Sequence, residues 1–213
     1  MENMTNLNLN RTIRMIGDLV PEDGKDLASD IINELLDYKD ELDDLFKALA
    51  MEKENMLLEG KYSEEYVEQE IDKVINSLSP EITLVINSGG GDVTQGFAII
   101  DILEELKSEY GVNVKTHTVG TCASMAVAVL MAGDIRTSGK NTIFMLHQMN
   151  GGGIGSQTKI ESAIQCMNIL SKKYKSTILA NSKITEDELC DILDKDKDYY
   201  FDIEQAQKWG FVE

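Results

Sequence analysis

The feature that most constrains this chain is a run of five residues, Ile-Thr-Leu-Val-Ile at 82–86, which a glycine-rich turn follows at once. An almost continuous apolar run between turn signals is typical of a strand that is buried on both faces of a parallel sheet. The turn at 87–91 leads into a segment with apolar residues at helical spacing, namely Phe97, Ile100, Leu103 and Leu106. Because parallel strands need a crossover connection, this order predicts a βαβ unit.

The same alternation continues to the end of the chain. Further strands are predicted at 114–119 and 142–146, then a long helix near 156–180, and finally a short helix that Asp202 caps. An earlier strand is predicted at 12–20, followed by a turn at Pro21. A chain of 213 residues has the length of one domain. We therefore predict a single α/β domain over residues 1–213, built from right-handed βαβ units.

Residues 22–62 interrupt this alternation with a charged helical pattern. Residues that recur every three or four positions lie on one face of a helix, and here they are Leu27, Ile31, Leu35, Tyr38, Leu42, Leu45 and Leu49. Gly60 ends the pattern, and Ser63 is suited to cap a second helix. The apolar face of such a helix must be buried, either on its own subunit or by reshaping a surface of an assembly.

The composition excludes several classes of partner. The formal net charge is −18, and the acidic residues are spread along the chain. This field repels nucleic acid and anionic membrane surfaces, so neither is an expected partner. Three irregularly spaced cysteines and two histidines argue against a disulfide framework and a metal site, and no cofactor is expected. The first residues lack a signal-peptide core and no apolar run reaches about 20 residues, so the expected location is the cytoplasm.

Ser124 is the first candidate for chemistry. It lies between a predicted strand and an apolar helical segment, in the string Gly-Thr-Cys-Ala-Ser-Met-Ala at 120–126. Free backbone N–H groups at a helix N-terminus favour the negative charge of an attacking alkoxide and of an oxyanion. A serine in this position can equally be a simple helix cap.

His147 and the acidic C-terminal region supply candidates for the remaining roles. His147 follows the predicted strand at 142–146, and ligands gather at the carboxyl ends of strands in open α/β sheets. His117 lies in mid-strand and receives no role. The run at 191–198 contains several aspartates that could orient a histidine, and periodicity does not choose among them. The turn at 87–91 lacks the spacing of a phosphate-binding loop, and its N–H groups suit a substrate carbonyl.

Four strings together resemble one family. They are Ile-Asn-Ser-Gly-Gly-Gly at 86–91, Ala-Ser-Met at 123–125, Met-Leu-His-Gln at 145–148, and the ending from Asp198 to Glu213. They occur in the order and spacing of the Clp protease proteolytic subunit, and the resemblance covers residues 63–213 and the first strand. It implies a spiral α/β core of the type that crotonases share, a protruding handle helix near 156–180, and serine endopeptidase activity.

The resemblance also implies a role for individual residues. Ser124 would be the nucleophile, His147 the base, and Asp198 the carboxylate that orients the base. The backbone N–H groups of Gly90 and Met125 would form the oxyanion hole. A peptide or unfolded protein substrate would lie between two strands that contribute Gly91, Val93, Met149, Asn150 and Gly151. The family assembles as two stacked heptameric rings that enclose the serines, and a Clp-type ATPase is a possible partner.

The chain departs from the family pattern in five ways. Gly89 and Met149 stand where the family usually has proline, which loosens both turns. Ala126 replaces a glycine after the nucleophile's methionine. The segment before the first strand is too short for the family's full axial hairpin, and residues 22–62 form a helical insertion. We expect this insertion either to cap the axial face or to pack on its own subunit.

Three other functions fit parts of this pattern. A phage-type capsid-maturation peptidase of the same fold would use the same chemistry. A crotonase-like acyl-CoA enzyme also uses oxyanion N–H groups, but it needs no Ser-His-Asp set. A catalytically silent ring subunit would typically lack one of the three residues, and all three are present here.

Overall fold

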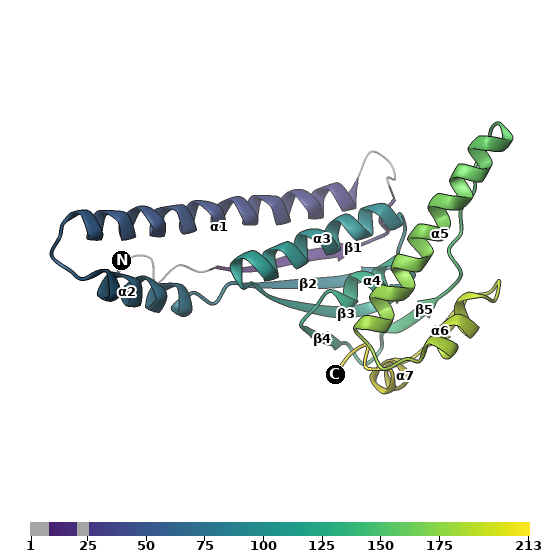
Figure 1. Ribbon diagram of the computed structural model, residues 1–213. Helices are drawn as coiled ribbons and strands as arrows, with labels where there is room; N and C mark the ends of the chain where they lie inside the picture. The colour runs from purple at the N-terminus through teal and green to yellow at the C-terminus, as the bar shows by residue number, and fades with distance from the viewer. Residues whose placement is uncertain (1–8, 21–25) are drawn as a thin grey trace.

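The computed structural model describes residues 9–20 and 26–213 of the chain (Figure 1). In chain order, its elements are β1 (Asn10–Ile16), α1 (Leu27–Leu58), α2 (Glu64–Ser77), β2 (Glu81–Ser88), α3 (Val93–Tyr110), β3 (Asn113–Ala123), α4 (Met125–Met131), β4 (Ile135–Ser138), β5 (Ile143–Leu146), α5 (Gln157–Ala180), α6 (Glu186–Leu193), β6 (Tyr199–Phe201) and α7 (Ile203–Lys208). The turn predicted at Pro21 lies outside the described residues.

The sheet confirms the predicted α/β fold. Strands β1, β2 and β3 are parallel neighbours that helical crossovers connect, and the order continues to β5 and then to the antiparallel β6. Strand β3 has two partners on its far side: residues 115–118 pair with β4, and residues 121–123 pair with β5. The strands β4 and β6 were not predicted, because both are too short to show a pattern in the sequence.

A bend in β3 separates these two pairings. The register against β2 shifts between Ile86 and Ser88, and Gly120 adopts a φ of +71° at the bend. Asn87 holds the bend, since its side-chain oxygen accepts the N–H of Thr121 at 3.0 Å. The bend brings Ser88 beside Cys122, so the segments that follow β2 and β3 meet at one edge of the sheet.

Strand β2 is buried on one face only. Ile82, Leu84 and Ile86 are buried, whereas Val85 between them is half-buried. Helices α1 and α3 lie along the same face of the sheet (Figure 1) and leave the other face less covered. The prediction of burial on both faces was therefore wrong for the single chain.

The segment predicted as a helical insertion is one helix, α1, followed by α2. Ser63 caps α2 as predicted, and its side chain accepts the N–H of Tyr66. The apolar face of α1 is buried within the same chain, in two parts. Its first half joins the main core through Ala28, Ile31, Leu35, Tyr38 and Leu42, whereas Leu45 and Leu49 form a smaller cluster with Val74 of α2. Only the second half of α1, together with α2, extends beyond the sheet as a helical hairpin (Figure 1).

The remaining helices agree with the sequence. Helix α5 begins after the cap Ser156 and rises away from the sheet (Figure 1), which confirms the predicted long helix. Asp202 caps α7 as predicted. Strand β1 ends at Ile16 rather than at residue 20, and beyond it Leu19 makes a single bridge to Gly91. None of the described helices has the length and apolar character that crossing a bilayer requires.

Candidate active site

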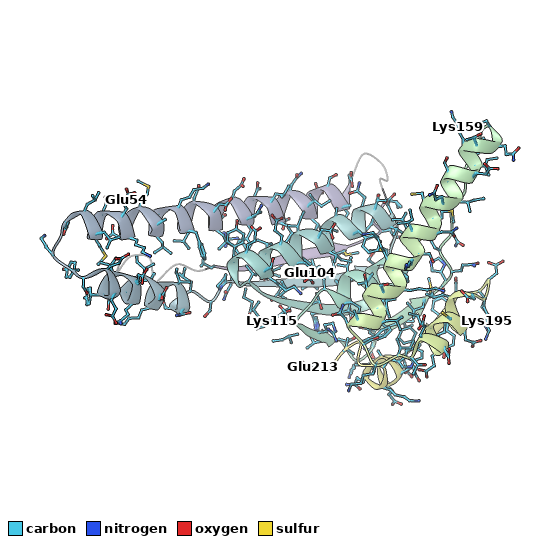
Figure 2. All side chains as sticks on the ribbon, viewed as in Figure 1. Glu54, Glu104, Lys115, Lys159, Lys195 and Glu213 are labelled. Carbon is cyan, nitrogen blue, oxygen red and sulfur yellow. The ribbon has the colours of Figure 1, made fainter. Side chains whose placement is uncertain are left out.

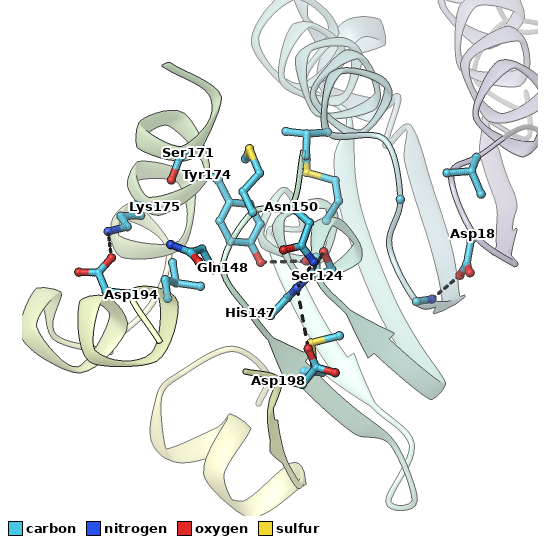
Figure 3. A pocket seen from close by; sticks show the side chains of 18 residues that line it. Asp18, Ser124, His147, Gln148, Asn150, Ser171, Tyr174, Lys175, Asp194 and Asp198 are labelled. Atoms are coloured by element: carbon cyan, nitrogen blue, oxygen red, sulfur yellow. Dashed lines mark hydrogen bonds and ion pairs between the residues drawn. The ribbon is translucent and has the colours of Figure 1, made fainter. Parts of the chain in front are cut away.

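A cavity of about 480 Å³ opens where the chain leaves β3 and β5 (Figure 3). Ser124, His147 and Asp198 all line it, so the structure brings the three predicted catalytic residues together. Four of the predicted substrate-binding residues line it too: Gly91, Val93, Met149 and Asn150. Gly151 does not line this cavity and instead lies against α5, where an added Cβ would be 3.1 Å from the sulfur of Met167.

Ser124 occupies the turn between β3 and α4. Its backbone has φ 53° and ψ −125°, and it is the one non-glycine residue of the described chain with a positive φ. A conformation of this kind costs about 1–3 kcal/mol, so surrounding contacts must hold it. The N–H of Ser124 donates to the carbonyl oxygen of Met145 at 2.9 Å. Its own carbonyl oxygen accepts the N–H of Val127 at 3.0 Å and the hydroxyl of Tyr174 at 2.9 Å.

The side chain of Ser124 faces His147 rather than the helix. It makes no capping hydrogen bond to α4, so the alternative of a simple helix cap does not hold. Instead its Oγ lies 2.8 Å from Nε2 of His147 (Figure 3). His147 follows β5 directly, as the sequence predicted. A hydroxyl and an imidazole nitrogen at this distance can exchange a proton.

The other ring nitrogen of His147 has two neighbours. Nδ1 lies 3.9 Å from Oδ1 of Asp198 and 3.4 Å from Nδ2 of Asn150. The first distance allows an ion pair but is too long for a hydrogen bond. The Asp198 side chain is 50% exposed, against 20% for His147, and its Oδ2 accepts the hydroxyl of Tyr200 at 3.3 Å.

Two other aspartates of the acidic run form ion pairs with lysines. Asp194 pairs with Lys175 at 3.1 Å, and Asp191 pairs with Lys195 at 2.6 Å. Asp198 is thus the residue of this run that the described structure pairs with His147. The second histidine, His117, bonds to Oγ1 of Thr137 at 2.8 Å in the middle of the sheet.

The glycine-rich turn packs directly on the peptide between Ser124 and Met125. A Cβ on Gly90 would lie 2.7 Å from Cβ of Ser124 and 2.9 Å from the nitrogen of Met125, so only glycine allows this approach. The N–H of Gly90, expected to serve the oxyanion hole, donates to Oγ of Ser88 at 3.0 Å. By contrast, the N–H groups of Gly91 and Met125 have no acceptor within residues 9–20 and 26–213. The available donor of this turn is therefore Gly91 rather than Gly90.

The segment after β1 holds this turn in place. Oδ1 of Asp18 accepts the N–H of Gly89 at 2.7 Å, and the N–H of Leu19 donates to the carbonyl of Gly90 at 2.6 Å. A proline at position 89 could not make the first of these bonds, because proline has no N–H. The loosening expected from Gly89 is thus offset by Asp18. Sequence reasoning missed Asp18, which lies 71 positions from its partner and follows no local pattern.

The two strands expected to flank the substrate are absent from the described structure. Val93 is instead the first residue of α3, because the side chain of Asp92 accepts the N–H groups of Thr94 and Gln95 and starts a helix there. Residues 147–150 have no regular secondary structure. In place of the two expected strands, the cavity is therefore lined by a helix start and an irregular segment.

Burial and hydrogen bonding set the electrostatics of the site. Burial raises the pKa of the Tyr174 hydroxyl well above its usual value, which keeps this group a protonated donor. The Thr94 hydroxyl, and then the N–H of Gln95, hold the pKa of Asp92 below its usual value. Within the described residues, no group of three or more His, Cys, Asp or Glu side chains could hold a metal ion.

Comparison with known proteins points to one family. The family model of the Clp protease matches residues 37–213, a range that includes much of α1. The chain is 30% identical over 168 residues to the ATP-dependent Clp protease proteolytic subunit 2 of Treponema pallidum (strain Nichols), which covers 76% of this chain and 81% of that protein. It is 35% identical over 139 residues to the ATP-dependent Clp protease proteolytic subunit 2 of Chlamydia trachomatis serovar D, covering 62% of this chain and 64% of that protein.

Proposed function

The chain belongs to the Clp protease family of serine peptidases, and on that premise we propose that it cleaves peptides or unfolded proteins with Ser124 as nucleophile. The observation that carries the proposal is the 2.8 Å contact between Oγ of Ser124 and Nε2 of His147. A serine hydroxyl is a weak nucleophile, and an adjacent base is what activates it.

The proposed reaction is acyl transfer. His147 accepts the proton of Ser124 as Oγ attacks the scissile carbonyl, and then returns that proton to the leaving amine. Water, activated by the same imidazole, hydrolyses the acyl-enzyme and regenerates the serine. Asp198 keeps the imidazole in the tautomer that presents Nε2 to the serine.

The oxyanion of the tetrahedral intermediate needs hydrogen-bond donors that are already in place. We assign this role to the N–H groups of Met125 and Gly91, because both lie beside the cavity with no acceptor in the described chain. Removing one such donor from a serine peptidase costs about 10²–10³ in kcat.

The contact between Ser124 and His147 also bears on the two alternative functions. A crotonase-like acyl-CoA enzyme does not require a serine bonded to a histidine at its cavity wall. The presence of this contact therefore argues against that function. A phage-type peptidase would perform the same reaction, and it differs from the proposal only in its substrate.

We further propose assembly into stacked heptameric rings that enclose the serines, with a Clp-type ATPase as a partner. Support comes from α5, which projects from the sheet (Figure 1) and carries the exposed side chains Ile160, Ile164 and Ile169. Apolar side chains gathered on a projecting element are typical of an interface. Light scattering should report a large ring assembly, and a monomer under all salt conditions would contradict it.

The nucleophile can be tested by covalent labelling. A fluorophosphonate should modify Ser124, as mapped by mass spectrometry, and Ser124→Ala should abolish both labelling and hydrolysis of fluorogenic peptides. Unchanged hydrolysis by a folded Ser124→Ala variant would overturn the proposed function.

A further inference from the structure

The geometry points to Tyr174 as a positioning residue that aims one donor of the oxyanion hole. This inference rests on the proposed function and adds a residue to it. Tyr174 lies on α5, 50 positions after the nucleophile, and its hydroxyl donates to the carbonyl oxygen of Ser124 at 2.9 Å (Figure 3).

The argument begins with the peptide bond between Ser124 and Met125. In a trans peptide, the C=O and the N–H point in opposite directions, and the described chain contains no cis peptide. A bond that fixes the carbonyl of Ser124 therefore also fixes the direction of the N–H of Met125. The glycine-rich turn lies near that nitrogen, since an added Cβ on Gly90 would be 2.9 Å from it.

This peptide needs more support than the helix gives it. Ser124 has a positive φ, and its carbonyl accepts one backbone bond, from Val127 at 3.0 Å. This one hydrogen bond restrains the carbonyl oxygen of Ser124 from the direction of α4 only. The hydroxyl of Tyr174 supplies a second bond to the same oxygen, from the direction of α5. The two bonds together define the plane of the peptide.

Tyr174 is suited to this role by its surroundings. Its side chain is 6% exposed, so solvent competes little for the hydroxyl. Burial keeps that hydroxyl protonated, and the ring lines the cavity with Ser124 and Met125. Phenylalanine would fill the same space without donating a hydrogen bond, which makes Tyr174→Phe a narrow test.

The chain offers a matched control in Tyr38. Its buried hydroxyl also donates to a backbone carbonyl, that of Leu9 at 2.6 Å, but it lies on α1, away from the cavity. Tyr174→Phe and Tyr38→Phe each delete one buried hydroxyl and one bond to a carbonyl. A loss of activity in the first variant alone would thus come from the position of the bond.

The experiment measures kcat and KM for a fluorogenic peptide, together with the affinity for a peptide boronate whose adduct places an oxygen in the oxyanion hole. Tyr174→Phe should lower kcat by about 10-fold, which is less than deleting a donor outright, and should change KM by less than about 2-fold. Boronate affinity should fall by a similar factor. Tyr38→Phe should leave all three unchanged, and Tyr174→4-aminophenylalanine, which restores a donor, should recover part of the loss.

The outcomes separate this inference from the proposed function. If Ser124 is labelled and required but Tyr174→Phe keeps the kcat and boronate affinity of the Tyr38→Phe control, the positioning role is overturned. A rise in KM with kcat unchanged would overturn it equally. Hydrolysis that survives Ser124→Ala would overturn the proposed function itself.

Discussion

The neighbours of the two ring nitrogens of His147 differ in how many hydrogen bonds hold them and in how exposed they are. On the Nε2 side, Ser124 is held by bonds to Met145, Val127 and Tyr174, and its hydroxyl lies 2.8 Å from the ring. On the Nδ1 side, Asp198 is half exposed and lies 3.9 Å away. Ser124, with its positive φ, is supported by buried backbone contacts, whereas Asp198 lies just before the short edge strand β6 and near solvent. We therefore expect the effects of substitution to decrease from one side to the other.

The largest effect is expected at the contact between Ser124 and His147. Ser124→Ala and His147→Ala should each reduce kcat by at least about 10⁴, because each removes the activated nucleophile. The double variant should be no slower than either single variant, since the two residues act as one unit. Hydrolysis of a fluorogenic peptide measures all three, and circular dichroism checks the fold. A double variant far slower than both singles would show that they act separately.

The next effect is expected at Asp198. Asp198→Asn should lower kcat by about 10²–10⁴, the upper limit being the loss seen when a buried triad carboxylate is replaced. We expect a value below that limit because the carboxylate is exposed and makes no hydrogen bond to the ring. Asp194→Asn and Asp196→Asn are matched controls in the same acidic run and should stay within a few-fold of wild type. A larger loss at Asp196 would assign the orienting role to that residue.

A smaller effect is expected at Asn150, the second neighbour of Nδ1. Asn150→Ala alone should lower kcat by less than about 5-fold, as expected for one exposed hydrogen bond. Its effect should grow in the Asp198→Asn background if the amide takes over part of the orienting role. A double-mutant cycle measures this coupling. Strict additivity would show that Asn150 does not contact the ring in solution.

The sequence predicted those elements whose structure depends on a local pattern of residues. The apolar period of α1 and the caps Ser63 and Asp202 predicted helices that the structure confirms. The strings around Ser124 and His147 predicted two residues that meet across 23 positions. Their contact follows from parallel strands ending at the same sheet edge, which is a regular feature of the fold.

The parts that could not be predicted depend on contacts between distant segments. Asp18 and Tyr174 reach their partners across 71 and 50 positions, and no local pattern indicates either contact. The sequence could not show that the N–H of Gly90 donates to Ser88 while the N–H of Gly91 keeps no acceptor in the described chain, because the direction of an N–H in a turn depends on backbone angles such as the φ of +101° at Gly90. Similarly, the apolar period of α1 is continuous, although its two halves pack in different clusters.

The smallest effect concerns Asp92, whose carboxylate caps the start of α3 directly after the glycine-rich turn. The pKa of this carboxylate is held below the usual value by Thr94 and Gln95. A carboxylate with a lowered folded pKa stabilises the protein above the unfolded pKa of about 4, and this contribution is lost as pH falls through the folded value. Asp92→Ala should therefore lower the free energy of unfolding by about 1 kcal/mol at pH 7.

The pH dependence distinguishes this cap from simple packing. The difference in stability between wild type and Asp92→Ala should shrink as pH falls below about 4, because the unfolded wild-type chain then binds a proton that the folded carboxylate binds only at a lower pH. Asp92→Asn, which keeps an oxygen acceptor without the charge, should lose less at pH 7 and show less of this pH dependence. Denaturant unfolding at pH 7 and at pH 3 measures each difference. A difference between wild type and Asp92→Ala that stays constant with pH would show that the charge of Asp92 does not stabilise the protein through the start of α3.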